Sequence, residues 1–380
     1  MGRAHPECIG DSSLSQPASL LYLRPATGGI HRHSQLIERL YTQAGQPLRV
    51  ITVDESRATA GWRGLWLGLK MALFSPETII QAEVGFHSTI TVWALLTCQT
   101  LSHKRLVITI HEAEPVLESL FPFRWWGQRR RPISSLVNRL RRLLDGWWRQ
   151  KAMRRLVMQA DEIITLSPDT RVFGRLSEYA PLPLYVPEVP AYHTPPQPAV
   201  GFLGYWGGAK GIEVLVQAAG RLTGQGVKAR WIIAGSTGNT DDDYTRSIKR
   251  LARQSGATIE FPGPIAEPDM LSFLQGLSVL VIPYRPSLKG IASGMAVWAA
   301  NAGVPVIASD TPALRAQLAG AAAYVPPDDS VALSKAIAHH LQTPRQLEQR
   351  AARAQATLLV ERNDAVLSRQ LLAIVKGEVS

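Results

Sequence analysis

The sequence predicts an α/β protein built from two doubly wound domains that face each other across a cleft. In residues 19–167, short β-branched runs alternate with helical segments, and the same alternation restarts at residue 199. Between these halves, residues 180–199 contain seven prolines. Proline fixes φ and removes a hydrogen-bond donor, so this stretch is predicted to be a hinge. Two βα-alternating halves joined by a hinge favour two parallel sheets, each covered by helices on both faces.

Each half contains apolar, β-branched runs of the kind found in strands buried on both faces. The predicted strands are 19–25, 48–53, 78–84, 105–112, 161–167, 199–204, 229–235, 258–263, 279–284 and 305–309. Helices are predicted between them, for example at 212–222 and 270–277, and from about residue 330 to the end. Because ligands of doubly wound sheets bind at the carboxyl ends of the strands, the loops that follow the strands are the predicted site.

These elements set the predicted domain boundaries. The segments are a flexible N-terminus at 1–18, a domain at 19–185, a proline-rich linker at 186–198, a second domain at 199–355 and a final helix at 356–380. A short edge strand is expected at 183–186, and the final helix can pack back on the N-terminal domain. With 380 residues, each domain is large enough to bury a core.

Composition favours a cytoplasmic protein. Cys8 and Cys98 are the two cysteines, which give no disulfide framework and no metal-ligand spacing. Residues 1–18 contain no apolar stretch of signal-peptide length. The most apolar long stretch, 291–309, is interrupted by two glycines and a proline. It therefore reads as a helix, a turn and a buried strand, not as a membrane span.

The net charge of +11 is concentrated in one segment. Between Arg124 and Arg155 there are eleven basic residues and one acid. Residues 133–157 have apolar residues at three- and four-residue spacing, which predicts an amphipathic helix. Its predicted contact residues are Arg139, Arg141, Arg142, Trp147 and Trp148. Basic residues beside tryptophans are typical of a helix lying on an anionic membrane surface. The alternative is a helix packed on its own domain with a solvated basic face. No nucleic-acid motif accompanies the charge, so nucleic acid is not the predicted partner.

Two glycine-containing loops, and a Ser-Gly pair described below, can hold an anion at a helix N-terminus. Gly28 and Gly29 follow the first strand, and Gly207 and Gly208 precede Lys210 in the loop 204–211. Backbone N–H groups, the helix dipole and one ammonium suit a diphosphate. The loop differs from a P-loop in its spacing, and it lacks a Ser or Thr after the lysine. The alternatives are a strand-to-helix turn at Gly28 and a solvated lysine at position 210.

Ser293 and Gly294 open a predicted apolar helix. Their N–H groups and the serine hydroxyl can bind a phosphate; the alternative is that Ser293 is only the N-cap of the helix.

His111 and Glu112 end a predicted buried strand and point into the cleft, although a strand-end histidine is often structural. Asp241, Asp242 and Asp243 precede a helical stretch. They are interpreted as capping residues and not as a metal cluster, so no metal is predicted.

Taken together, these features resemble the retaining GT-B glycosyltransferases that use nucleotide sugars, along nearly the whole chain. The matching segments are GGIHRHSQLIERLYTQAGQPLRVITV, VITIHE, ADEIITLS, GFLGYWGGAKGIEVLVQAAGRL, FPGPIAEPDMLSFLQGLSVLVIPY and GVPVIASD. The resemblance implies an N-terminal acceptor domain and a C-terminal donor domain. It implies that Lys210 contacts the donor diphosphate, that His111 contacts the donor sugar and that Gly28 and Gly29 approach the phosphates. Pro264 lies in the segment that resembles the base-proximal loop.

Two features depart from the family pattern. Tyr205 stands where the family usually has arginine, and Gly290 and Trp298 stand where it has a pair of glutamates. A subset of the family carries Ser-Gly before this helix, as Ser293 and Gly294 do here. The chain is placed nearer to that subset.

The resemblance implies transfer of a sugar from a nucleoside-diphosphate sugar to a glycan or polyprenyl-linked acceptor, with retention and without a metal. Bacterial surface polysaccharide or glycolipid synthesis at the inner face of the cytoplasmic membrane is the expected setting. Two alternatives stay open. One is a catalytically silent binding or partner subunit, which would explain the missing glutamates. The other is a nucleotide-sugar epimerase, which would need no acceptor.

Overall fold

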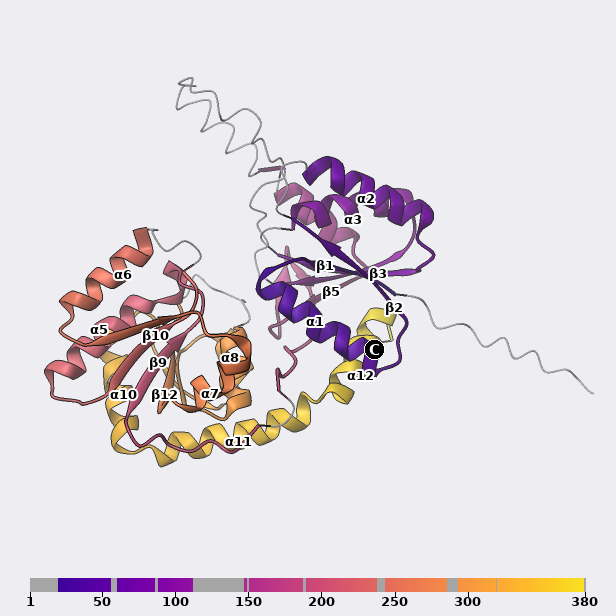
Figure 1. Ribbon diagram of the computed structural model, residues 1–380. Helices are drawn as coiled ribbons and strands as arrows, with labels where there is room; N and C mark the ends of the chain where they lie inside the picture. The colour runs from indigo at the N-terminus through magenta and orange to yellow at the C-terminus, as the bar shows by residue number, and fades with distance from the viewer. Residues whose placement is uncertain are drawn as a thin grey trace, which may run out of the picture.

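The protein consists of two α/β domains, one on the right and one on the left of Figure 1. The computed structural model describes residues 20–55, 60–85, 88–111, 147–148, 150–186, 189–237, 243–285, 293–318 and 320–378. Each domain contains one six-stranded sheet, and in both sheets all neighbouring strands are parallel. This is the GT-B architecture, so the predicted fold class is confirmed.

The N-terminal sheet has the strand order β2-β1-β3-β4-β5-β8. Its strands are β1 (Leu20–Pro25), β2 (Leu48–Val53), β3 (Ile79–Val84), β4 (Arg105–Ile110), β5 (Glu162–Thr165) and β8 (Glu178–Tyr179). A separate antiparallel hairpin is formed by β6 (Arg171–Val172) and β7 (Arg175–Leu176). Every residue of β3 is buried, as expected of a strand covered on both faces.

Two groups of helices cover the two faces of this sheet. One face is covered by α2 (Ala60–Phe74), α3 (Thr89–Leu101) and the helical residues 150–159. The other face is covered by α1 (Gly28–Gln43) and by α12 (Asp364–Lys376) from the far end of the chain. Figure 1 shows α12, in yellow, beside α1. Leu367 and Leu371 of α12 lie in one apolar cluster with Leu20 of β1, so the C-terminus helps to complete the core of the N-terminal domain.

The C-terminal sheet has the order β11-β10-β9-β12-β13-β14. Its strands are β9 (Ala199–Leu203), β10 (Arg230–Ala234), β11 (Ile259–Gly263), β12 (Val279–Ile282), β13 (Val306–Ser309) and β14 (Ala322–Val325). The helices are α5 (Ile212–Gly224), α6 (Asp243–Gln254), α7 (Met270–Gln275), α8 (Gly294–Ala302), α9 (Pro312–Leu318), α10 (Ser330–Gln342) and α11 (Arg345–Glu361). Helix α5 packs against α6 and α10, and α8 packs against α7, α9 and α11. Two short 3-10 helices, η2 (Gly208–Lys210) and η3 (Glu267–Asp269), follow β9 and β11.

Each of the ten predicted strands contains an observed strand. The edge strand predicted at 183–186 is wrong, because these residues form no strand. Pro181 and Pro183 remove backbone donors there, and β8 takes the edge beside β5 instead. Leu182 and Leu184 pack in a small apolar cluster with Val297 of α8. The residues just before the linker are therefore held by side-chain packing against Leu166 of the N-terminal domain and α8 of the C-terminal domain.

Within the described residues, none of the helices combines the length and the apolar composition that crossing a bilayer requires.

Candidate active site

The loop that carries Lys210 is fixed by two glycines with no room for a side chain. A Cβ atom on Gly235 would lie 1.8 Å from the carbonyl oxygen of Gly204, and one on Gly211 would lie 2.0 Å from that of Pro283. Both glycines also have positive φ, +120° and +63°, which L side chains rarely adopt. These contacts hold the ends of β9, β10 and β12 close together.

Lys210 lies over the ring of Tyr284, which follows β12. Its ammonium nitrogen is 3.8 Å from the ring centroid, close enough for a cation–π contact. The Tyr284 hydroxyl oxygen is 3.0 Å from Oγ of Ser293. Tyr284 therefore brings the two C-terminal residues predicted to neutralise a diphosphate into one cluster.

Ser293 caps helix α8. Its Oγ accepts a hydrogen bond from the backbone N–H of Ala296 at 3.2 Å, and its own N–H donates to Oε1 of Gln317 at 2.6 Å. The hydroxyl is therefore used within the protein. Because Ala296 is capped in this way, the start of α8 can offer an anion the backbone N–H groups of Gly294 and Met295, together with the positive end of the helix dipole.

The sequence prediction missed Arg285, which holds the Lys210 loop in place through hydrogen bonds and an ion pair. Its guanidinium donates to Oδ1 of Asp328 at 2.8 Å and to the carbonyl oxygen of Gly208 at 3.2 Å, and it forms an ion pair with Glu213. Its backbone N–H donates to the carbonyl oxygen of Ala209 at 3.0 Å. The signal was available, because Tyr284 and Arg285 directly follow a buried strand, where this architecture gathers ligand-binding residues.

Trp298, one of the residues that depart from the pattern of the resembling family, packs on the segment that leads into the linker. Its buried ring stacks on Tyr185 with a centroid distance of 4.5 Å and an interplanar angle of 5°. A Cβ atom on Gly294 would lie 3.0 Å from the Tyr185 hydroxyl oxygen, so the glycine leaves room for this side chain at the start of α8. Asn301 completes the contact through hydrogen bonds to the backbone N–H and carbonyl of Val186, both at 2.9 Å. Gly290 lies outside the described residues.

The N-terminal glycine pair opens α1 and is exposed. Helix α1 begins at Gly28, whose φ is +91°. A Cβ atom on either Gly28 or Gly29 would meet no atom within 4 Å, so space remains around this helix start. One turn further, Arg32 forms an ion pair with Glu267 of η3 at 2.7 Å. This contact joins the first turns of α1 to the C-terminal segment that begins at the exposed Pro264.

His111 is hydrogen-bonded to a buried carboxylate that the sequence analysis did not single out. Glu83 of β3 is 1% exposed. Its Oε2 lies 2.6 Å from Nε2 of His111, and its Oε1 accepts a hydrogen bond from the Tyr22 hydroxyl at 2.6 Å. The ring of His33, from α1, meets the His111 ring edge-on at 5.0 Å, and its Nε2 lies 3.7 Å from Oε2 of Glu83. Strands β1 and β3, the end of β4 and helix α1 thus place four polar side chains together.

Burial decides the charges in this group. Burial lowers the pKa of His33 to about 4, and this effect exceeds the influence of Glu83. Burial acts to raise the pKa of Glu83, but the neighbouring imidazoles and the hydrogen bonds of His111 and Tyr22 outweigh it and lower that pKa. Near neutral pH, Glu83 is therefore ionised and His33 is neutral. An ionised carboxylate only accepts hydrogen bonds, so Nε2 of His111 carries a proton and donates it.

The ligand atoms of His33, Glu83 and His111 all lie within 4.8 Å of one another, so these residues were considered as metal ligands. Two ligand atoms on a tetrahedral zinc ion are separated by about 3.3 Å, whereas the His111 and Glu83 atoms are 2.6 Å apart. The arrangement is that of a hydrogen-bonded network. Both ring nitrogens of His33 are buried without a hydrogen-bond partner among the described residues.

The buried neutral His33 predicts a loss of stability in mild acid. Between pH 6.5 and 4 the unfolded chain protonates this imidazole and the folded chain does not, so the free energy of unfolding falls as the pH is lowered. A shift of this size corresponds to about 3 kcal/mol. Urea unfolding at a series of pH values measures it. His33→Leu should flatten the pH dependence in this window, while His193→Leu on the exposed linker should not; equal slopes for all three proteins would contradict this assignment.

Part of the predicted site lies outside the described residues. Arg139, Arg141, Arg142 and the aspartates at positions 241 and 242 belong to this part. Trp147 and Trp148 are described and about half exposed, with their rings edge-on at 4.9 Å. The Lys151 ammonium lies 4.7 Å from the Trp147 ring centroid. Asp243 is the first residue of α6 and pairs with Arg246 at 2.6 Å, as expected of a residue near a helix N-terminus.

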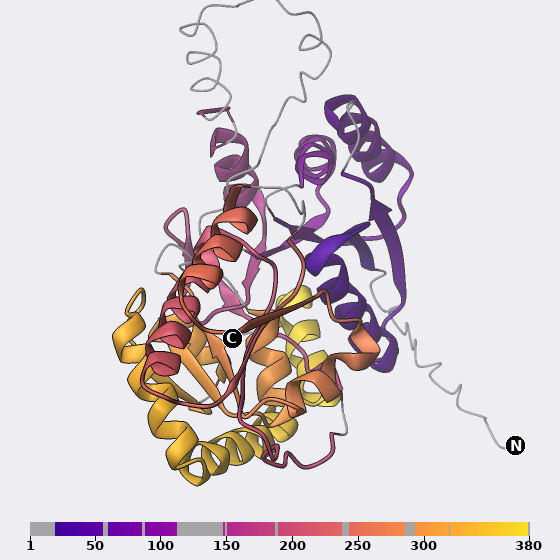
Figure 2. The ribbon, with the colours of Figure 1, turned by 60° about the vertical axis from the view of Figure 1, so that its left-hand side comes forward.

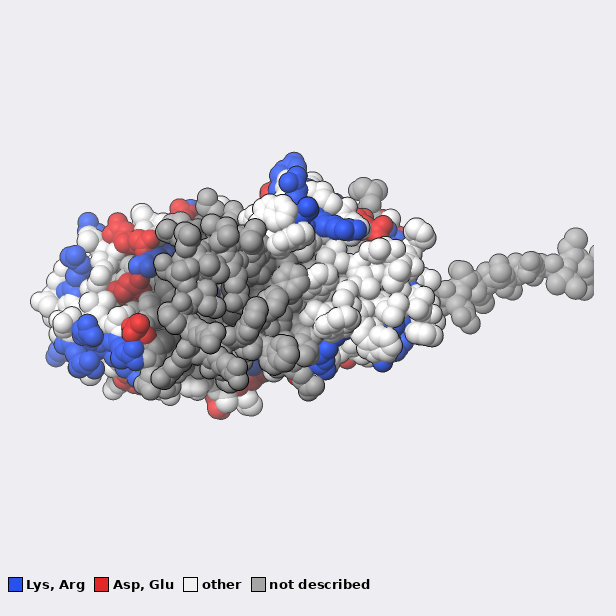
Figure 3. All heavy atoms as spheres, turned by 90° about the horizontal axis from the view of Figure 1, so that it is seen from above, with Lys and Arg blue, Asp and Glu red and all other residues white. Residues whose placement is uncertain are grey.

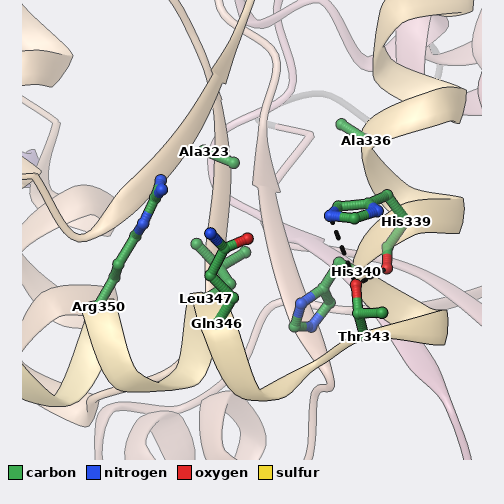
Figure 4. Close-up of a pocket in the computed structure, with 8 residues that line it drawn as sticks. All are labelled: Ala323, Ala336, His339, His340, Thr343, Gln346, Leu347 and Arg350. Atoms are coloured by element: carbon green, nitrogen blue, oxygen red, sulfur yellow. Dashed lines mark hydrogen bonds between the residues drawn. The ribbon is translucent and has the colours of Figure 1, made fainter.

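A pocket in the C-terminal domain contains none of these residues. Figure 4 shows it between β14, α10 and α11, with His339 hydrogen-bonded to Thr343. Its volume is about 80 Å³, whereas sites for small molecules usually have about 300 Å³ or more. His340, which also lines the pocket, bonds through Nε2 to the carbonyl oxygen of Ser278 at 2.9 Å. This pocket is therefore a packing feature.

A family model of glycosyltransferases matches most of the C-terminal domain. Residues 197–343 match the family model of glycosyl transferases group 1. These residues form a glycosyltransferase domain, and the enzyme class of the chain is glycosyltransferase. No curated protein matches the chain in sequence.

Solved structures resemble the whole chain in fold. Sucrose-phosphate synthase from Thermosynechococcus elongatus is 16% identical, with a TM-score of 0.69 over 95% of this chain and 99% of that one. HepE from Anabaena is 15% identical, with a TM-score of 0.64 over 94% and 99%. A glycosyltransferase from Rickettsia africae is 11% identical, with a TM-score of 0.67 over 95% and 98%. At such identities these likenesses establish the shared fold of the two domains.

Proposed function

We propose that this enzyme transfers a sugar, with retention of configuration, from a nucleoside-diphosphate sugar to a glycan or polyprenyl-linked acceptor. The expected setting is bacterial surface polysaccharide or glycolipid synthesis at the inner face of the cytoplasmic membrane. The observation that carries the proposal is the cluster of Lys210, Tyr284 and Ser293 at the strand ends of a glycosyltransferase domain. HepE, which has a similar fold, has been solved with UDP-glucose, and this supports a nucleotide sugar as the donor.

The main chemical demand is to stabilise the leaving diphosphate while the sugar becomes oxocarbenium-like. The Lys210 ammonium, the backbone N–H groups of the Gly207–Gly208 loop and the first turn of α8 would supply positive potential from fixed positions. We therefore expect the reaction to need no metal ion. The base-proximal loop at Pro264 and the exposed Gly28–Gly29 helix start would approach the donor from two sides. His111, oriented by Glu83, would contact the donor sugar.

Closure of the two domains would exclude water, so that the sugar reaches the acceptor and is not hydrolysed. Arg32 and Glu267 already join the facing domains. We propose that the acceptor binds to the N-terminal domain. The predicted basic segment 133–157, with Arg139, Arg141 and Arg142, would hold that domain at an anionic membrane surface beside a lipid-linked acceptor.

A catalytically silent partner subunit is a second candidate, and the specific observation for it is Trp298. This buried side chain stacks on Tyr185 in the place where the family carries a carboxylate. A nucleotide-sugar epimerase of this fold is the third candidate, and it would isomerise the donor without any acceptor.

The expected result that separates these candidates is release of nucleoside diphosphate that requires an acceptor. Thermal unfolding in the presence of a panel of nucleotide sugars identifies the donor, because a ligand that binds the folded state raises the midpoint. Turnover is then measured with that donor and a polyprenyl-phosphate-linked sugar. Donor binding with no released diphosphate would favour the silent subunit, and an isomerised nucleotide sugar formed without acceptor would favour the epimerase.

A further inference from the structure

Helix α2 has its small residues on its inner face. A Cβ atom on Gly64 would lie 2.4 Å from Cβ of Trp93, and one on Gly68 would lie 2.4 Å from the carbonyl oxygen of Ala94. Both contacts are on α3, so side chains at these positions would push the two helices apart. The close packing of α2 on α3 thus uses glycines, and the large side chains of α2 are left for its outer face.

The outer face of α2 is apolar and exposed. Trp62 is 81% exposed, Trp66 is 59% exposed and Phe74 is 77% exposed, and Leu65 and Leu73 are exposed as well. Trp62, Trp66 and Leu73 recur at four- and seven-residue spacing and therefore share one stripe of the helix. Single exposed apolar residues are common, but a contiguous row of this kind marks an interaction surface.

The same face carries positive charge. Arg63 and Lys70 are exposed, residues 60–74 include no acid, and the Lys70 ammonium lies 5.4 Å from the Trp66 ring centroid. Arg63, Trp66 and Lys70 line a pocket of about 240 Å³ at the end of β2, in which Asp54 is the one acidic lining residue. Among the described residues, neither Arg63 nor Lys70 forms an ion pair. Two cations against one carboxylate leave the pocket positive.

Trp147 and Trp148, which are about half exposed, come shortly before the helical segment 150–159, and this segment covers the same face of the sheet as α2. Met71 of α2, Leu95 of α3 and Met153 of the helical segment 150–159 belong to one core cluster, so all three helices cover the same face of the sheet. In the view of Figure 2, α3 lies between α2 and that segment. Figure 3 shows the side of the molecule above these helices, where blue Lys and Arg atoms border a broad white area on the right-hand domain.

We propose that the outer face of α2 is a second membrane-binding surface, with its tryptophans and Phe74 in the headgroup region of an anionic bilayer and a lipid phosphate between Arg63 and Lys70. Tryptophan beside basic residues suits the interface between lipid and water. A second copy of this chain fits less well, because a symmetric contact through α2 would bring the same cations face to face. This surface acts in addition to the basic segment 133–157 of the proposed function, and its binding to lipid does not depend on sugar transfer.

Co-sedimentation of the full chain with vesicles tests the proposal. The vesicles consist of phosphatidylcholine with or without phosphatidylglycerol, and neither contains a donor or an acceptor. The double variants Trp62→Ser/Trp66→Ser and Arg63→Glu/Lys70→Glu should each lower the affinity for the anionic vesicles by about tenfold or more. Added salt should weaken binding of the wild type. Matched controls are Val360→Ser, an exposed apolar residue of α11, and Lys249→Glu/Arg250→Glu on the exposed face of α6.

The charge-reversed variant Arg139→Glu/Arg141→Glu/Arg142→Glu is measured alongside, and the α2 substitutions should lower binding further in that background. Thermal stabilisation by the donor is recorded for every variant, so a failure of the proposed function shows separately from a failure of this surface. Wild-type vesicle affinity in both α2 variants would overturn the proposal. So would sedimentation velocity showing a dimer that Trp62→Ser/Trp66→Ser dissociates while vesicle binding stays unchanged.

Discussion

Lys210→Ala is expected to lower kcat for sugar transfer by about 100-fold or more, the usual cost of removing one preorganised charge-stabilising group. The ammonium is held over the Tyr284 ring by a loop that Gly211 and Arg285 fix in place. Removing it takes away the cation proposed to stabilise the leaving diphosphate but leaves this scaffold intact. The folding stability should therefore change little. Steady-state kinetics and thermal unfolding of the same preparation measure both quantities.

Three further variants show whether charge at this position is responsible. Lys210→Arg keeps a cation and should retain more activity than Lys210→Ala. Tyr284→Phe keeps the ring under the ammonium but removes the hydroxyl contact with Ser293, so it should have a smaller effect. Lys335→Ala removes an exposed lysine of α10 and should match the wild type. A Lys210→Ala enzyme with wild-type kcat would remove the main support for the proposed mechanism.

The sequence predicted the sheets well because their strands are buried on both faces. Runs such as residues 105–112 and 279–284 have one stable place in a domain, between two layers of helices. The strand β14 was missed because Ala322 and Ala323 give no β-branched signal. The edge strand at 183–186 was wrongly predicted from its apolar residues, whose packing on α8 is a tertiary contact that no local pattern reveals.

The candidate site was only half predictable. Lys210 and Ser293 stand in glycine-containing loops at helix starts, where the sequence gives a local signal. Tyr284 was absorbed into the end of the predicted strand 279–284, and Arg285, the next residue, was not singled out. The outer face of α2 was not recognised, because glycines usually mark turns and here they mark a close helix contact. Glu83 was missed because it lies inside an apolar strand, and its partners Tyr22, His33 and His111 are brought to it by three other segments.

That buried glutamate gives the second large expected effect. Glu83→Ala should lower the free energy of unfolding by about 2–6 kcal/mol, because each of the two donors that lose their acceptor costs about 1–3 kcal/mol. The substitution leaves the Tyr22 hydroxyl and the His111 Nε2–H without their acceptor, and buried donors without acceptors are costly. Urea unfolding at neutral pH, where Glu83 is ionised, measures the loss.

Glu83→Gln separates the positioning role from the structural one. The amide oxygen can still accept from Tyr22, but the amide nitrogen then faces His111 and donates to it. Nε2 of His111 must become an acceptor, so the ring proton should move to Nδ1, which nitrogen-15 NMR of the histidines detects. We expect a folded enzyme with kcat lowered by about tenfold to a hundredfold, as for a misoriented site group.

Glu77→Gln is the matched control, because Glu77 is also a buried carboxylate, just before β3, with Arg49 and Ser75 as partners and no histidine. It should leave the His111 tautomer and kcat unchanged. If Glu83→Gln lowers stability but keeps both the tautomer and kcat of the wild type, Glu83 serves the fold alone. If tautomer and kcat change together while the protein stays folded, the carboxylate acts through His111, because a purely structural role would leave the ring proton where it is.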